Sequence, residues 1–198
     1  LNINNYVVIT NLRDLVYVWD GNNGLGTTNW SLGSNWVGEQ APINDGRARV
    51  FFAANSTKTN SFININWNIA MLSFSNLAGM STHTLSGSNL TIQGYGTNGV
   101  STGIWHNAVA DQRINASIII GAGTNGTQTW VADGGAGADL ILCGQVDVRD
   151  SDLILEGTRG YVIEGGSGIL LLTNGSIELT AAGGLTVTNG ATINHGAA

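Results

Sequence analysis

The acidic residues whose spacing comes nearest to that of a catalytic site lie in one turn, where Asp147, Asp150 and Asp152 surround Arg149. Grouped carboxylates act as acid and base on polysaccharides or bind calcium, and a nearby basic residue suits removal of a proton from a sugar ring. Here Arg149 belongs to the same turn as the carboxylates, and neighbouring segments add few charges. The pattern therefore favours a solvated, charge-compensated corner over an active site.

A glycine-rich segment, residues 134–141, reads Gly-Gly-Ala-Gly-Ala-Asp-Leu-Ile and matches one copy of a calcium-binding nonapeptide. Such a site takes oxygen ligands from adjacent coils, so a single copy cannot complete it. The glycines recur at residues 165–168, but Leu170 stands where the second aspartate is needed. We expect a glycine corner here and no bound metal.

The remaining reactive side chains have no catalytic spacing. His83, His106 and His195 are far apart in the sequence, and no nucleophile or phosphate-binding motif is present. Cys143 is the only cysteine, follows an apolar run and is expected to be a buried hydrophobic residue. The sequence therefore predicts no enzyme activity and no cofactor.

Composition narrows the possible partners. The net charge is −6 and the arginines are scattered, which argues against nucleic acid binding. No run of eighteen apolar residues is present, so we expect no membrane insertion by this segment.

A short repeat predicts the fold. From Leu140 onward, three or four apolar or β-branched residues alternate with turns rich in Gly, Asn, Asp, Ser and Thr, and three such units span 21–24 residues. This spacing is typical of an all-β solenoid with three strands per coil. Leu140 should then stack on Tyr161, and Tyr161 on Leu185. The expected core consists of Leu140, Leu142, Leu153, Leu155, Ile169, Leu171, Leu185 and Val187.

Three regions differ in their residue types and strand pattern, and we expect a strand-forming arm at 1–18, an N-terminal β cap at 19–82 and the solenoid at 83–198. The cap holds four tryptophans, which could offer a sugar-stacking platform. We favour packing, because an open solenoid end must be covered by bulky apolar groups. These four are Trp19, Trp30, Trp36 and Trp67.

The cap also carries a recognisable pattern of aromatic and polar residues. It consists of Trp19-Asp-Gly21, Asn29-Trp-Ser31, Asn35-Trp36, Pro42, Asp45 and Val50-Phe-Phe52, and later Gln128-Thr-Trp130 and Leu185–Ala191. This pattern resembles bacterial secreted proteins with autotransporter-associated β-strand repeats. The resemblance implies a cell-surface or extracellular β-helix without an assigned activity. Together with the crossover rule, it also implies a right-handed parallel β-helix.

We therefore expect an extracellular structural building block whose partner is another copy of itself or a cell-surface or matrix polysaccharide. Head-to-tail assembly into filaments would use the apolar arm, which could equally pair within its own cap. The arm residues are Tyr6, Val7, Val8, Ile9, Leu15, Val16, Tyr17 and Val18. The alternatives are an adhesin that binds glycans or host surfaces, and a β-helix polysaccharide lyase or hydrolase.

Overall fold

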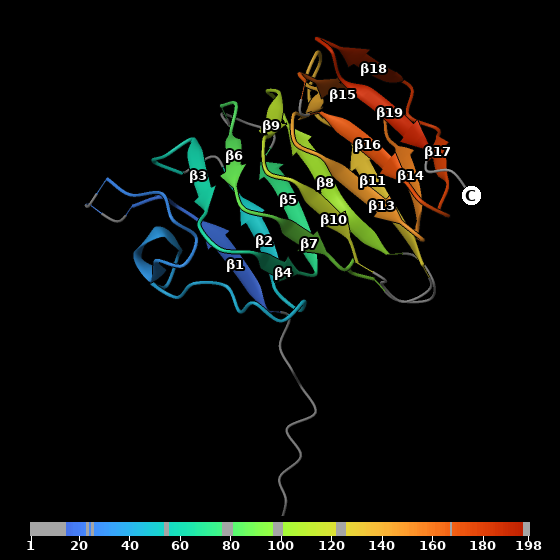
Figure 1. Ribbon diagram of the computed structural model, residues 1–198. Helices are drawn as coiled ribbons and strands as arrows, with labels where there is room; N and C mark the ends of the chain where they lie inside the picture. Colours follow the sequence, from blue (N-terminus) through green and yellow to red (C-terminus); the bar gives the residue numbers. More distant parts are fainter. Residues whose placement is uncertain are drawn as a thin grey trace, which may run out of the picture.

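Three parallel β-sheets build the protein in the computed structural model, which describes residues 15–22, 24, 26–53, 56–76, 81–96, 101–121, 126–166 and 168–195 (Figure 1). The first sheet contains, in order, β1 (Val16–Trp19), β2 (Arg49–Phe52), β5 (Met71–Asn76), β8 (Thr102–Ala108), β11 (Thr127–Ala132), β14 (Asp152–Glu156) and β17 (Ile177–Leu179). The second contains β3 (Asn60–Ile63), β6 (Thr84–Gly87), β9 (Gln112–Ile114), β12 (Leu140–Leu142), β15 (Tyr161–Glu164) and β18 (Leu185–Thr188). The third contains β4 (Trp67–Ile69), β7 (Leu90–Ile92), β10 (Ile118–Ile120), β13 (Val146–Arg149), β16 (Ile169–Leu172) and β19 (Thr192–His195).

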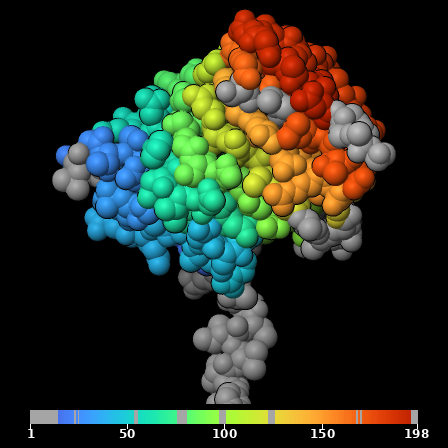
Figure 2. All heavy atoms as spheres, in the orientation of Figure 1, coloured from blue at the N-terminus to red at the C-terminus, as the bar shows by residue number. Residues whose placement is uncertain are grey.

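From β2 onward, each coil contributes one strand to each sheet, and each strand pairs in parallel with its equivalent one coil away. Leu140 lies opposite Tyr161, and Tyr161 lies opposite Leu185, which confirms the predicted stacking. The three-sided β-solenoid is therefore confirmed. In Figure 2 the coils form adjacent bands that follow the sequence from blue to red. Within the described residues, one short 3-10 helix, η1 (Gly33–Asn35), is the only helical element.

The number of residues per coil varies, although every coil pairs its strands in the same three parallel sheets. Leu155 lies opposite Leu179, which is 24 positions later, whereas Leu72 lies opposite Ile104, 32 positions later. The strands stay parallel on both sides of this longer coil, with one irregularity of register where β8 pairs with β11, between Thr129 and Trp130. The corners between strands therefore absorb differences in length.

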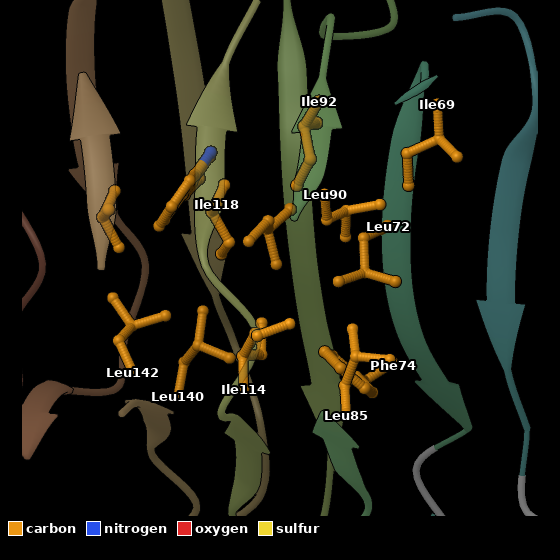
Figure 3. Close-up of a cluster of buried hydrophobic side chains, with 14 of the residues drawn as sticks. Ile69, Leu72, Phe74, Leu85, Leu90, Ile92, Ile114, Ile118, Leu140 and Leu142 are labelled. Carbon is orange, nitrogen blue, oxygen red and sulfur yellow. The ribbon is translucent and has the colours of Figure 1, made fainter. Parts of the chain in front are cut away.

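The core is a column of side chains that point inward from all three sheets, and Figure 3 shows ten of them labelled. Leu140, Leu142, Leu153 and Leu155 are buried as predicted. In β16 the predicted alternation was wrong, because Leu170 and Leu172 are buried and Leu171 is only partly so. Leu170 lies opposite the buried Val146, which sets the inward phase of this strand.

The last described coil presents its inward residues to solvent. Val187 lies opposite the buried Ile163, yet it is 42% exposed, and Leu185 is only half-buried. Leu179 and Ile193 are 44% and 48% exposed on the other two sheets. No strand of the described residues lies beyond β17, β18 or β19, so no described strand covers these positions.

Aromatic residues close the opposite end of the solenoid, where the segment between β1 and β2 lies (Figure 1). Trp19, Trp30 and Trp36 are buried, and Trp36 packs edge-on against both of the others, with ring centroids 5.2 and 5.5 Å away. The indole N–H of Trp36 donates to the Trp30 carbonyl oxygen at 2.8 Å. The aromatic-rich cap is thus confirmed, and its tryptophans pack rather than offer a surface for sugars.

The sheets run without a break across both predicted domain boundaries. β1 pairs with β2, and β5 pairs with β8, so strands before and after residue 82 belong to one stack. The division of the chain into a separate arm, cap and solenoid, with boundaries at residues 18 and 82, stays a prediction.

Candidate functional surfaces

The acidic turn around Arg149 does not bring its carboxylates to one point. Arg149 adopts a left-handed backbone with φ 55°, and its Nε lies 3.1 Å from Asp147 Oδ2. Asp150 and Asp152 instead accept hydrogen bonds from residues one coil further on. The donors are Asn174 Nδ2 at 2.7 Å, and the backbone N–H and hydroxyl of Ser176 at 3.1 and 2.6 Å. These carboxylates therefore join coils.

The glycine-rich segment that resembles a calcium motif ends in another such contact. The N–H of Asp139 donates to Asp111 Oδ1 at 2.8 Å, and Asp139 Oδ1 accepts the N–H of Gly160 at 3.1 Å. The two bonds link three successive coils at one corner. Within the residues that the structure describes, no group of three or more His, Cys, Asp or Glu side chains could hold a metal ion.

Asparagine and aspartate side chains make the same contact at other corners. Asn44 Oδ1 accepts the N–H of Asn68 at 2.6 Å, and Asn66 Oδ1 accepts the N–H of Asn89 at 3.2 Å. Each of these side chains provides an acceptor for a backbone N–H of the next coil. We name these contacts the corner clamps.

Two of the three histidines, for which the sequence predicts no catalytic role, lie in the core. His83 and His106 are both almost completely buried, and neither Nε2 has a hydrogen-bond partner among the described residues. Burial lowers the pKa of His83 to about 3 and also lowers the pKa of His106. The His83 ring lies 4.3 Å from the Phe52 ring. These imidazoles are therefore neutral packing groups; the side chain of His195 lies outside the described residues.

Cys143 is half-buried rather than buried, which corrects the sequence expectation. Its Sγ lies 3.2 Å from Arg113 Nη2, which also forms an ion pair with Glu164, and Asn189 Nδ2 donates to Glu164 at 3.0 Å. Desolvation raises the pKa of the Cys143 thiol, which keeps it protonated and weakly nucleophilic. The four side chains line a shallow depression across the second sheet.

The residues predicted to mediate self-assembly are placed only in part. Tyr6, Val7, Val8 and Ile9 lie outside the described residues. Leu15 immediately precedes β1, which contains Val16, Tyr17 and Val18 and pairs in parallel with β2 of the same chain. Tyr17 is buried, and the Leu15 carbonyl oxygen accepts the N–H of Arg49 at 2.7 Å. This section of the arm therefore belongs to its own solenoid.

Sequence reasoning missed an aromatic surface on the outer face of the first sheet. Trp105 in β8 is 38% exposed, whereas the other five tryptophans are at most 4% exposed. Tyr95 is also exposed, and the Arg49 guanidinium lies 4.2 Å from the centre of its ring. The hydrophobic pattern of this strand does not predict the surface, because in Ile104-Trp105-His106 the histidine points inward and the tryptophan points outward.

Comparisons with family models, with curated proteins and with solved structures gave no match for this chain. None of the described helical segments has the length and apolarity needed to cross a lipid bilayer.

Proposed function

We propose that this protein is an extracellular structural element, a β-solenoid that builds part of a cell surface or matrix. The corner clamps carry the proposal, because the carboxylates that catalysis would need instead join one coil to the next, as Asp139 and Asp152 do. Continuous ladders of parallel strands bond the coils on all three sides. The resemblance to secreted surface proteins in the cap region supports the extracellular location.

Two measurements test this role. Fractionation of cells that produce the protein should place it outside the cell, and incubation with neutral and acidic polysaccharides should release no reducing ends or unsaturated sugars. The variant Asp150→Asn serves as the control, since it removes one carboxylate of the acidic turn. Release of sugar that this variant abolishes would establish a lyase or hydrolase and overturn the structural role.

We further propose that copies assemble head to tail, with the N-terminal arm of one copy covering the last coil of the next. The exposed Leu179, Val187 and Ile193 support this, as do the outer edges of β17, β18 and β19, which have no partner strand in the described part of the chain. An unpaired edge is a template for another strand. Because β1 pairs with its own β2, the exchanged segment would be residues 1–14. Such a contact is heterologous and produces open filaments unless the rotation between copies closes a ring.

Sedimentation and electron microscopy of two variants test the assembly. Deletion of residues 1–14, and separately the substitution Val187→Lys in the last coil, should each leave soluble monomers with unchanged circular dichroism. Val109→Lys is the matched control, because Val109 is also 42% exposed but lies in the turn after β8. Fibres formed by the deleted protein, or a full-length protein that stays monomeric at high concentration, would exclude arm exchange.

A further inference from the structure

The exposed aromatic surface has a regular geometry. Trp105 in β8 lies opposite Ser73 in β5, and Ser73 lies opposite Phe51 in β2. The two aromatic residues therefore share one row on the outer face, about 9.6 Å apart along the solenoid axis, which is two strand spacings. Ser73 between them is fully buried, and its hydroxyl has no hydrogen-bond partner within the described residues. The row runs in the direction in which an extended polymer could follow it.

Within this row, Trp105 provides the available ring. The Arg49 guanidinium occupies the region above Phe51 and Tyr95, at 5.4 and 4.2 Å from their ring centres. Trp105 takes part in none of the ring contacts found among the described residues. An exposed indole outside the aromatic core is the kind of flat apolar surface that a ligand can cover.

Polar groups flank the indole on the same face. The row continues from Trp105 to Val131 in β11 and then to the exposed Glu156 in β14. Asn107, two residues after Trp105 on β8, lies beside Ser75 on β5. An indole with an amide two residues along its strand and a carboxylate two strands away matches an extended ligand with apolar ring faces and hydroxyl groups at its edges.

We propose that this outer face, formed by Phe51, Tyr95, Trp105, Asn107 and Glu156, binds a neutral polysaccharide. Trp105 stacks on the C–H face of one pyranose ring and Asn107 hydrogen-bonds to the hydroxyls of that ring, while Glu156, two strand spacings further along the row, hydrogen-bonds to a later sugar of the same chain. Phe51 and Tyr95, with Arg49 between them, extend the surface along the axis. Two strand spacings are comparable with the repeat of two sugars in an extended glycan, so neighbouring repeats can follow the row.

The size and charge of the surface favour this ligand. Trp105 and Tyr95 are 38% and 37% exposed and Phe51 is less so, and at ~150–250 Å² per side chain the three offer at most about 280 Å² together, whereas a stable protein interface needs about 800 Å² per partner. The net charge of −6 and Glu156 in the same row disfavour acidic polymers through repulsion, and Arg49, the one cation among the described residues of this surface, lies against the Phe51 and Tyr95 rings. The row lies on the side of the solenoid, and Trp105 is on β8, the middle strand of the first sheet, so sugar binding at Trp105 is independent of head-to-tail assembly.

Tryptophan fluorescence tests the site directly, because quenching by acrylamide reports mainly on Trp105 when the other five indoles are buried. Cellohexaose, xylohexaose and mannohexaose are the probes, with oligogalacturonate as the acidic comparison. We expect at least one neutral probe to protect Trp105 from quenching. By calorimetry, Trp105→Ala should bind that probe at least tenfold more weakly, whereas Trp105→Tyr should keep part of the affinity.

Phe62→Ala is the matched control, since Phe62 is a 42% exposed aromatic residue on β3 of the second sheet. It should bind the probe as the unmodified protein does, and thermal unfolding of all variants should show a folded chain. The proposal is overturned if no neutral probe binds at millimolar concentration, or if Trp105→Ala leaves the affinity unchanged. A change in sedimentation of Trp105→Ala without a change in sugar binding would instead identify a contact between copies.

Discussion

Protonation of the unfolded chain at His83 should make this fold less stable in mild acid. The folded pKa of His83 is about 3, because the ring is buried, whereas the ordinary value is 6.5. Below pH 6.5 the unfolded chain therefore binds a proton that the folded chain does not bind. Below pH 6.5, the free energy of unfolding therefore decreases by up to about 1.4 kcal/mol for each unit by which the pH is lowered.

The expected magnitude follows from these two pKa values. Between pH 7 and pH 5, His83 alone should lower the free energy of unfolding by about 2 kcal/mol. His106, whose pKa is also lowered by burial, acts in the same direction. Chemical denaturation followed by tryptophan fluorescence at closely spaced pH values measures the total slope.

The variant His83→Phe isolates the contribution of one imidazole. Phenylalanine fits the surroundings because Phe52 and Phe74 already lie within 4.3 and 6.5 Å of the His83 ring, and the His83 Nε2 bonds to no described residue. The loss of stability from pH 7 to pH 5 should be smaller by about 2 kcal/mol in this variant. His83→Leu is the second variant if the larger ring does not fit. An equal pH dependence in the variant and the unmodified protein would refute a buried, neutral His83.

Two further predictions concern the core and the corner clamps. Leu155→Asp should cost several kcal/mol of unfolding free energy, because it places an unpaired charge in the core. Ile154→Asp, on the outer face of the same strand, should cost much less. Equal midpoints of urea unfolding for the two variants would contradict the inward orientation of Leu155 in β14. Asp139→Ala should cost about 1–3 kcal/mol, because it leaves the N–H of Gly160 without its acceptor. The exposed Glu178→Ala is its control, and a melting temperature that falls no further in Asp139→Ala than in Glu178→Ala would show that the clamp contributes nothing.

The solenoid and its register were predictable because each strand unit carries its own turn signal. Leu140, Tyr161 and Leu185 stack as their spacing indicated. The phase of β16 was not predictable, since Ile169-Leu-Leu-Leu172 has no alternation and Val146 in the preceding coil decides which residues turn inward.

Buried polar residues were missed for a different reason. Gln112 is fully buried, and its amide donates to the Ala110 carbonyl oxygen while its Oε1 accepts the N–H of His83. A glutamine that bridges two coils looks like a surface residue in the sequence, because the His83 N–H that it accepts lies 29 positions earlier in the chain. Trp105 was missed because burial of its neighbour His106 runs against the usual ranking of hydrophobicity.

The unequal coil lengths have a consequence for how such a chain can change over evolutionary time. The segment from Leu72 to Ile104 is longer than the segment from Leu155 to Leu179, yet both return their strands to the same parallel register. An insertion at a corner therefore leaves the neighbouring coils undisturbed, whereas an insertion within a strand would reverse its inward and outward faces. New surface loops can be acquired one corner at a time, on a scaffold whose cross-section stays constant.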